Sequence, residues 1–276
     1  MGFQIGVIVD SFRLPIREGI RKAHEIGAEG IQIYAVDGAM HPDKLNLEER
    51  KELLRYIRSF GLKVSALCGD PGGGFMDRDT NRDKIRLSKK IIDLALDLEC
   101  QIVTTHIGVI PHDVDSERYK IMAEACEELG DYAKNMNASF AIETGPEPSA
   151  VLKEFLDRLH TSGVKVNFDP ANLVMVIGED PAEAVNNLKE YIVHTHAKDG
   201  RMITKYDPEE LYIRHTRSWE QAFIETPLGE GNVNFRQYLK ALRDINYQGF
   251  LTIEREVGEN PENDILRAVN FLRRLI

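Results

Sequence analysis

The chain has 276 residues, with 45 acidic and 35 basic side chains and a formal net charge of −10 at pH 7. Lysine and arginine form no run that could follow a phosphate backbone, and no apolar stretch is long enough to span a bilayer, so neither a nucleic acid nor a membrane is an expected partner. The three cysteines, Cys68, Cys100 and Cys126, are scattered and odd in number. This usage is typical of a reducing compartment, and because the N-terminus has no signal-like segment we expect a cytoplasmic protein.

Short β-branched or apolar runs recur along the chain and predict eight strands. They cover residues 3–9, 30–36, 63–68, 101–107, 139–143, 165–169, 192–196 and 250–254. Helical patterns lie between them, at residues 16–26, 47–60, 84–98, 116–135, 150–161, 181–188, 235–245 and 262–275. Eight strands that alternate with eight helices, without a Pro/Gly/Ser-rich linker, predict an α/β protein with one (β/α)8 TIM-barrel domain over residues 1–276.

An open doubly wound sheet, as in a two-domain Rossmann protein, has the same alternation and is the alternative architecture. It requires a glycine-rich phosphate turn early in the chain, yet the first predicted strand is followed by DSFRLP. The run Gly72-Gly73-Gly74 lacks the required spacing, so we interpret it as a pliable loop at the mouth, with a phosphate cradle as the weaker alternative. Two segments are long for barrel connections, residues 69–80 and a charged insertion at about 200–234 after strand seven, and such loops often cover or bind a ligand.

Four predicted strands end in residue types that bind metals. Parallel strands of a barrel direct their C-terminal ends to one mouth, so these side chains should converge. Each one alone has an ordinary explanation, such as a strand-end ion pair, a turn cap or a buried imidazole, but four unpaired buried polar groups would be costly without a shared counter-charge. Three carboxylates and one imidazole suit a single divalent ion, Mn, Mg, Co or Zn. The predicted ligands are Glu143, Asp169, His196 and Glu254.

Side chains alternate along a strand, so the residues two positions before three of these ligands share their face. Asn167, His194 and Thr252 should therefore form a polar layer beneath the ion and orient its ligands. The same alternation places His106 at the mouth, beside the proposed ion. Lys198, which follows the sequence HTHA, fits either a strand-end ion pair or a substrate contact.

At these motifs the chain resembles the xylose isomerase-like superfamily of TIM barrels, particularly the sugar phosphate isomerase/epimerase group with ketose 3-epimerases, hydroxypyruvate isomerases and inosose-processing enzymes. The likeness spans the whole chain through H-x-G at His106, Glu143, D-x-x-N from Asp169 to Asn172, HTHAKD, PLGEGNVNF and the I-E that ends at Glu254. The resemblance implies that the four predicted ligands hold one divalent ion and that Glu143 and Glu254 also transfer the proton. We further expect substrate contacts from His106, Asn172, Lys198 and Arg217. Asn172 stands where many epimerases have histidine, and Arg217 lies in the region where they place a substrate-binding arginine.

We therefore expect a divalent-metal-dependent isomerase or epimerase that acts on a small sugar or keto-polyol by proton transfer through a metal-stabilised enediolate. A metal-dependent dehydratase or lyase on a keto-sugar or inosose is the first alternative, because the same enolate can expel a leaving group. An endonuclease IV-type zinc phosphodiesterase is disfavoured by the acidic charge and by Cys68 and Asn172, which occupy positions where that group has histidines. A non-catalytic sugar-binding barrel is a further alternative, and the sequence leaves a homo-oligomer open.

Overall fold

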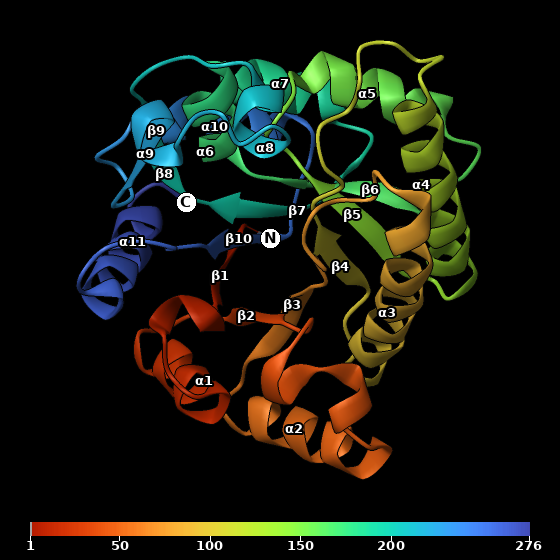
Figure 1. Ribbon diagram of the computed structural model, residues 1–276. Helices are drawn as coiled ribbons and strands as arrows, with labels where there is room; N and C mark the ends of the chain where they lie inside the picture. The colour runs from red at the N-terminus through yellow and green to blue at the C-terminus, as the bar shows by residue number, and fades with distance from the viewer. Residues whose placement is uncertain (1) are drawn as a thin grey trace.

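The computed structural model describes residues 2–276 and contains a closed barrel of parallel strands in the order β1-β10-β7-β6-β5-β4-β3-β2 (Figure 1). The strands are β1 (Gln4–Ile8), β2 (Gly30–Tyr34), β3 (Lys63–Cys68), β4 (Ile102–Thr105), β5 (Ser139–Glu143), β6 (Val164–Phe168), β7 (Ile192–Ala197) and β10 (Phe250–Ile253). All eight predicted strands are present, and the last one pairs with the first to close the barrel. The predicted (β/α)8 fold is confirmed.

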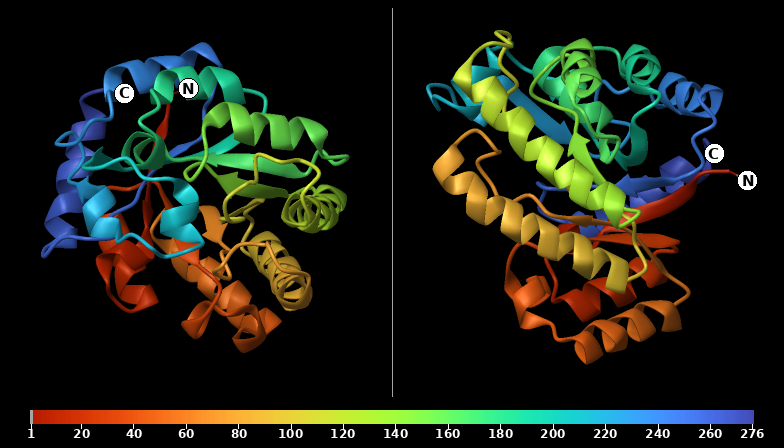
Figure 2. Two further views of the ribbon diagram at one scale, coloured as in Figure 1. Left: turned by 45° about the horizontal axis from the view of Figure 1, so that its top comes forward. Right: turned by 90° about the vertical axis from the view of Figure 1, so that its right-hand side faces the viewer.

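Helices surround the strands on the outside of the barrel (Figure 2). They are α1 (Ile16–Glu25), α2 (Leu47–Ser59), α3 (Arg78–Asp97), α4 (Glu117–Asn135), α5 (Ser149–Arg158), α7 (Pro181–Leu188), α10 (Phe235–Asp244) and α11 (Pro261–Arg273). Their apolar sides pack on the strands and form one hydrophobic core, while their polar sides face solvent. The predicted helix starts after Asn46 and Asp180 are confirmed, because both side chains cap the helix that follows.

Helix α3 begins at Arg78, so the prediction that it starts at residue 84 is wrong. Asp77 accepts a hydrogen bond from the N–H of Asp79 and caps the helix. The first turns are almost entirely polar and exposed, so they lack the apolar period on which the prediction relied. The loop after β3 is correspondingly shorter. Within it Gly74 has φ +60°, and a Cβ there would lie 2.4 Å from the carbonyl oxygen of Ile107, so only glycine fits against the end of β4.

The insertion after β7 is folded, contrary to the prediction of a long loop. Strand β8 (Asp199–Met202) pairs antiparallel with β9 (Phe223–Thr226). The short helices α8 (Pro208–Tyr212) and α9 (Trp219–Ala222) connect the two strands along the chain (Figure 1). The carboxylate of Asp199 accepts hydrogen bonds of 2.8 to 3.0 Å from the main-chain N–H groups of Gly200, Gly229, Gly231 and Val233. One buried side chain therefore connects the start of the β8–β9 hairpin to the segment that follows β9.

The barrel interior becomes polar toward the C-terminal ends of its strands. Buried polar side chains there come from β2, β3, β4, β6, β7 and β10: Gln32, Ser65, Thr104, Asn167, His194 and Thr252. The connection from β6 to α7 adds the short helix α6 (Pro170–Asn172) and a π-helical turn (Leu173–Ile177) at this end. Within the described residues, no helix combines the length and apolar character that a bilayer span requires.

Candidate metal centre

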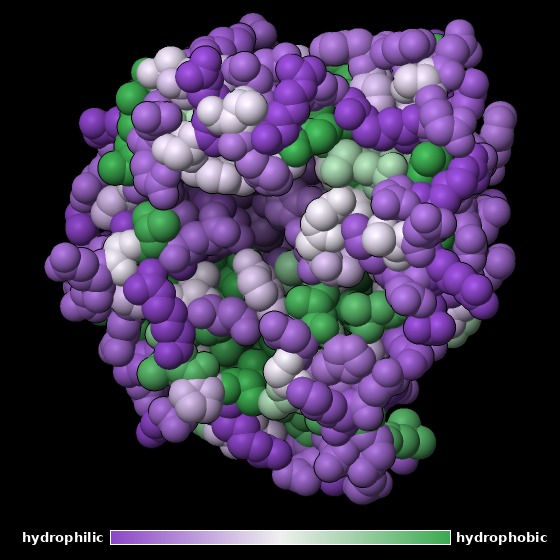
Figure 3. All heavy atoms as spheres, viewed as in Figure 1, coloured by the Kyte–Doolittle hydropathy of each residue, from purple (hydrophilic) through white to green (hydrophobic). Residues whose placement is uncertain are grey.

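The four predicted ligands meet at the C-terminal mouth of the barrel. Glu143 ends β5 and His196 lies in β7, while Asp169 and Glu254 directly follow β6 and β10. All four are buried, and one ligand atom from each lies within 4.8 Å of the others. His196 Nδ1 is 3.6 Å from Glu143 Oε1, 3.4 Å from Asp169 Oδ2 and 3.2 Å from Glu254 Oε2. On the face shown in Figure 3, a hollow bordered by hydrophilic residues opens where Figure 1 places β7 and β10.

These groups fit a divalent cation. Asp169 Oδ2, His196 Nδ1 and Glu254 Oε2 are buried without a hydrogen-bond partner among residues 2–276, and of these atoms Glu254 Oε2 has an ion pair with Lys198. The unpaired atoms are costly unless another group satisfies them. Burial alone would lower the pKa of His196, but the charges of Glu143 and Glu254 raise that pKa well above its ordinary value. The cluster thus attracts positive charge, and its three carboxylates and one imidazole match the donor set of Mn, Mg, Co or Zn sites.

The predicted polar layer lies beneath this cluster and holds its ligands in place. Asn167 Nδ2 donates to Glu143 Oε2 at 3.0 Å, and Asn167 Oδ1 lies 2.8 Å from His194 Nδ1. His194 Nε2 is in turn 2.9 Å from Thr252 Oγ1. Burial lowers the pKa of His194 well below its ordinary value, so this ring is neutral, donates from Nδ1 and accepts from the threonine hydroxyl. The alternation of strand side chains therefore predicted this layer correctly.

Gln32 is a member of the layer that the sequence analysis missed. Its Oε1 lies 3.1 Å from His196 Nε2, and its amide nitrogen donates to Thr104 Oγ1 at 3.1 Å. A proton on His196 Nε2 that is donated to Gln32 leaves the Nδ1 lone pair directed at the carboxylates, as a metal ligand requires. The available signal was a single amide residue within the apolar run of β2, GIQIY.

His106 and Asn172 both lie against Glu143. His106 Nε2 is 3.6 Å from Glu143 Oε1, and its Nδ1 is 3.1 Å from Asp70 Oδ2, in the loop after β3. Burial alone would lower the pKa of His106, but Glu143 and Asp70 raise it to about 9. Asn172 Nδ2 donates to Glu143 Oε1 at 3.0 Å. The structure therefore places both residues at the mouth, and their substrate contacts stay predictions.

The remaining two predicted substrate residues differ in position. Lys198 is buried, its Nζ lies 3.1 Å from Glu254 Oε2, and it also pairs with Glu256. Arg217 is exposed in the insertion, 3.8 Å from Glu210 Oε2 and over the ring of Tyr206. Within residues 2–276 it forms no hydrogen bond or ion pair with the four predicted ligands. Its substrate contact remains a prediction from the resemblance.

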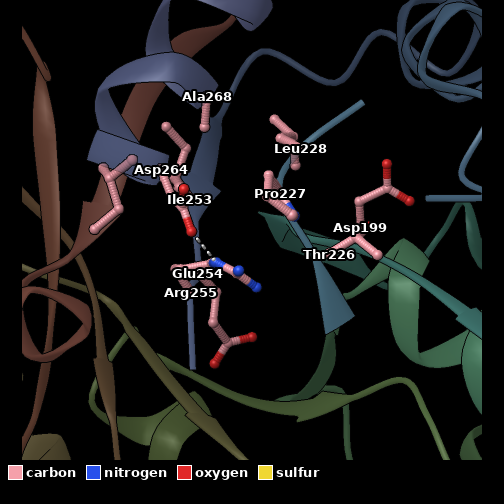
Figure 4. A pocket seen from close by; sticks show the side chains of 10 residues that line it. Asp199, Thr226, Pro227, Leu228, Ile253, Glu254, Arg255, Asp264 and Ala268 are labelled. Carbon is pink, nitrogen blue, oxygen red and sulfur yellow. Dashed lines mark hydrogen bonds and ion pairs between the residues drawn. The ribbon is translucent and has the colours of Figure 1, made fainter. Parts of the chain in front are cut away.

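The backbone that carries Glu254 is tied to the insertion. The next residue, Arg255, is buried and donates to Glu225 of β9 at 2.5 Å and to Asp264 of α11 at 2.9 Å. Figure 4 shows this arginine joined to Asp264 at a small pocket that Asp199 and Thr226 also line. These hydrogen bonds therefore fix the β8–β9 hairpin and strand β10 relative to each other beside the cluster.

Known proteins resemble this chain in sequence and in fold. Inosose dehydratase from Lacticaseibacillus casei is 25% identical over 169 residues, which cover 59% of this chain and 56% of that protein. The match thus spans little more than half the length of this curated relative. The crystal structure of a xylose isomerase domain protein from Planctomyces limnophilus has a TM-score of 0.82 at 25% identity and covers 99% of this chain and 96% of that chain.

A D-psicose 3-epimerase crystallised in the presence of D-fructose has a TM-score of 0.75 at 15% identity, with 99% of each chain covered, and this likeness concerns the fold. The family model described as xylose isomerase-like TIM barrel matches residues 20–275, a range that includes all four residues of the cluster. The chain therefore belongs to the xylose isomerase-like TIM barrel family.

Proposed function

We propose that the protein is a divalent-metal-dependent enzyme that moves a proton at a carbon next to the carbonyl of a keto-sugar or keto-polyol, as an isomerase or epimerase. One observation carries the proposal. The buried carboxylates of Glu143 and Glu254 stand at the ends of strands β5 and β10, which are three places apart in the closed eight-stranded barrel, so they approach the cluster from different sides. Two bases on different sides of a flat intermediate can remove a proton and return one.

The surroundings of the two glutamates suit this role. Burial alone would raise both pKa values, but His106 and His196 lower that of Glu143, while Lys198 and His196 lower that of Glu254 well below its ordinary range. Both side chains are therefore ionised at neutral pH and ready to accept a proton. An ion held by the four ligands supplies a Lewis acid that stabilises negative charge on neighbouring oxygen atoms.

Dehydration is the second candidate, favoured by the similarity to inosose dehydratases. The first step is the same removal of a proton next to a carbonyl. In a dehydration, the electron pair left on carbon then forms a double bond and expels a hydroxyl group from the neighbouring carbon as water, with a proton donated to the departing oxygen. The two candidates therefore share the base and differ in the fate of the intermediate.

The test is incubation of Mn²⁺-loaded protein with ketoses, inososes and keto-glycosides in deuterated water, followed by NMR. We expect deuterium at one carbon next to the carbonyl, with a new epimer or isomer if the first candidate is correct and an unsaturated product if the second is. Asp169→Asn and His196→Ala should lose both metal and exchange while they keep the fold. Metal-loaded protein that exchanges no hydrogen of any compound would contradict the proposal, and so would variants that bind metal as tightly as the parent.

A further inference from the structure

Glu254 lies just beyond the regular part of its strand. Strand β10 ends at Ile253, and Glu254 begins the irregular segment 254–260 that leads to α11. Its main-chain N–H still donates to the carbonyl oxygen of Ala197 at 3.2 Å, but the pairing of β1 with β10 ends at Val7 and Ile253. The position of Glu254 therefore also depends on how the segment after it is held.

Arg255 holds this segment directly behind Glu254. The two consecutive side chains leave the chain in different directions (Figure 4). Arg255 is 8% exposed, and its guanidinium donates from Nη1 to Glu225 of β9 at 2.5 Å and from Nε to Asp264 of α11 at 2.9 Å. Because a guanidinium is planar and rigid, the angle between these two hydrogen bonds is fixed. Arg255 therefore sets the end of β10 relative to both the β8–β9 hairpin and α11.

Glu225 contacts the same segment a second time, through the main chain. Both of its carboxylate oxygens accept hydrogen bonds of 3.2 Å from the N–H of Glu256. Glu225 is itself buried, in a strand of the hairpin. One carboxylate of the hairpin thus binds the side chain of residue 255 and the main chain of residue 256, immediately after Glu254.

The barrel holds the segment independently of the hairpin. The N–H of Arg255 donates to Ser11 Oγ at 3.1 Å, in the 3₁₀ helix that follows β1. Arg13 donates to the carbonyl oxygens of Glu256 at 3.0 Å and Gly258 at 2.8 Å. A variant that loses the contact between Arg255 and Glu225 therefore keeps these attachments to the barrel, and we expect it to fold.

The buried pair of Arg255 and Glu225 is better explained by geometry than by stability. Taking two charges out of water often costs as much as their attraction returns, so an apolar pair of similar size could stabilise the fold equally well. A charge-assisted hydrogen bond from a guanidinium instead fixes distance and direction. The residues whose relative position it fixes are Glu254, in the cluster, and the hairpin strand β9.

We propose that Arg255 is a positioning residue that couples Glu254 to the β8–β9 hairpin through Glu225, so that a cation in the cluster and the hairpin stabilise each other. The inference rests on the metal centre of the proposed function and goes beyond it, because it assigns a role to two residues outside the cluster. Such coupling is reciprocal. A cation held by Glu254 slows the opening of the hairpin, and a hairpin held in place raises the affinity for the cation.

Amide hydrogen exchange, followed by mass spectrometry with and without Mn²⁺, tests the coupling. In the parent we expect Mn²⁺ to slow exchange both in residues 254–260 and in strands β8 and β9. Arg255→Lys keeps the charge but loses the rigid fork, so Mn²⁺ should no longer protect the hairpin. The Kd for Mn²⁺ should rise about tenfold, as is typical when a residue that orients a metal ligand is lost. Glu225→Gln alters the other partner and should give the same result.

Arg267→Met is the matched control, because it removes an exposed ion pair with Glu230 between α11 and the segment after β9. It should change neither the protection nor the Kd for Mn²⁺. If Mn²⁺ protects the hairpin of Arg255→Lys and Glu225→Gln as in the parent, or if neither variant folds, the pair is only structural and the inference is wrong.

The parent protein separates this inference from the proposed function. If Mn²⁺ binds the parent without protecting the hairpin, the coupling alone is wrong. If the parent binds no Mn²⁺, the metal centre and the coupling are both wrong. Coupling in a protein that exchanges no hydrogen of any ketone would support this inference and contradict only the proposed reaction.

Discussion

Glu143 and Glu254 have different immediate partners although both belong to the cluster. Glu143 accepts hydrogen bonds from the neutral amides of Asn167 and Asn172, whereas Glu254 lies 3.1 Å from the Lys198 ammonium, which lowers its pKa well below the ordinary range. The weaker base is the better proton donor once it is protonated. We therefore assign removal of the substrate proton to Glu143 and delivery of a proton to the intermediate to Glu254, which first takes up a proton from solvent.

The Glu143→Gln and Glu254→Gln variants test this assignment, because glutamine keeps one coordinating oxygen but accepts no proton at neutral pH. Each should lose turnover by about 10²- to 10⁴-fold, the usual contribution of general acid–base catalysis. In deuterated water, Glu254→Gln should still exchange the substrate hydrogen, and Glu143→Gln should not. The reverse pattern would exchange the two roles, and near-parental turnover with metal bound would exclude the two-carboxylate mechanism.

The raised pKa of Glu147, which is buried in the loop between β5 and α5, leads to an expectation for how stability depends on pH. Its pKa is about 8 in the folded protein and near the ordinary 4.5 once unfolded, so between these values the folded state binds the additional proton. Stability should then fall as pH rises from about 5 to 8. Glu147→Gln removes this titration, so its Tm relative to the parent should increase over that range. A Tm difference that is constant from pH 5 to 8 would contradict the raised pKa.

The positions of the four proposed ligands and of the layer below them could be predicted, because these positions follow from the strand ends and from the alternation of strand side chains. Those of Asp70 and Glu147 could not, since both lie in irregular loops whose conformation depends on packing against other loops. Gln32 lies in a regular strand, but its role depends on His196 from a strand that does not neighbour β2 in the barrel.

The attachment of the β8–β9 hairpin depends on Asp199. Its carboxylate accepts hydrogen bonds from four main-chain N–H groups, one in β8 (Gly200) and three in the segment after β9 (Gly229, Gly231 and Val233). Asp199→Asn would direct an NH₂ group at one pair of these donors and leave them unpaired, at a cost of roughly 1–3 kcal/mol each. We expect a Tm lower by at least several degrees, measured by calorimetry. The exposed Asp207→Asn, in the same insertion, serves as a control and should change little.

The insertion also contacts one of the helices around the barrel through an ion pair. Glu209 of α8 pairs with Arg118 of α4, and the pKa of Tyr212 at the end of α8 is influenced by the charges of Lys198 and Glu143 at the mouth. Arg118→Met should loosen α8 and so change KM and kcat together, as expected for a segment that closes over substrate. Arg214→Met, which removes a pair within the insertion, is the matched control. If the folded Arg118→Met variant keeps the KM and kcat of the parent, this segment does not contribute to the reaction.

The barrel elements were predictable because each strand is a short β-branched or apolar run between helices with caps. The hairpin was not: β8 has the sequence DGRM and β9 has FIET, and neither carries an apolar run. Their pairing depends on the hydrogen bonds of Asp199 and on the contact of Glu225 with Arg255, which join residues distant in sequence.

For the whole molecule, a cation that binds only the folded protein should stabilise it. At a free concentration 100 times Kd, the gain is about 2.7 kcal/mol, which corresponds to an increase in Tm of roughly 5–10 °C for a chain of this size. Calorimetry with and without Mn²⁺ should show this increase in the parent and not in Asp169→Asn. An equal increase in both proteins would place the ion elsewhere.

The order of the strands has a consequence for biosynthesis. Glu143, Asp169 and His196 come from the consecutive strands β5, β6 and β7, whereas Glu254 follows β10, which pairs with β7 on one side and with β1 on the other. A nascent chain that has left the ribosome only as far as β9 therefore lacks both the fourth ligand and the strand that closes the barrel. The proposed cation site and the closed barrel are therefore completed at the same point of synthesis, so a chain that retains an ion in the proposed site has been translated through its last strand.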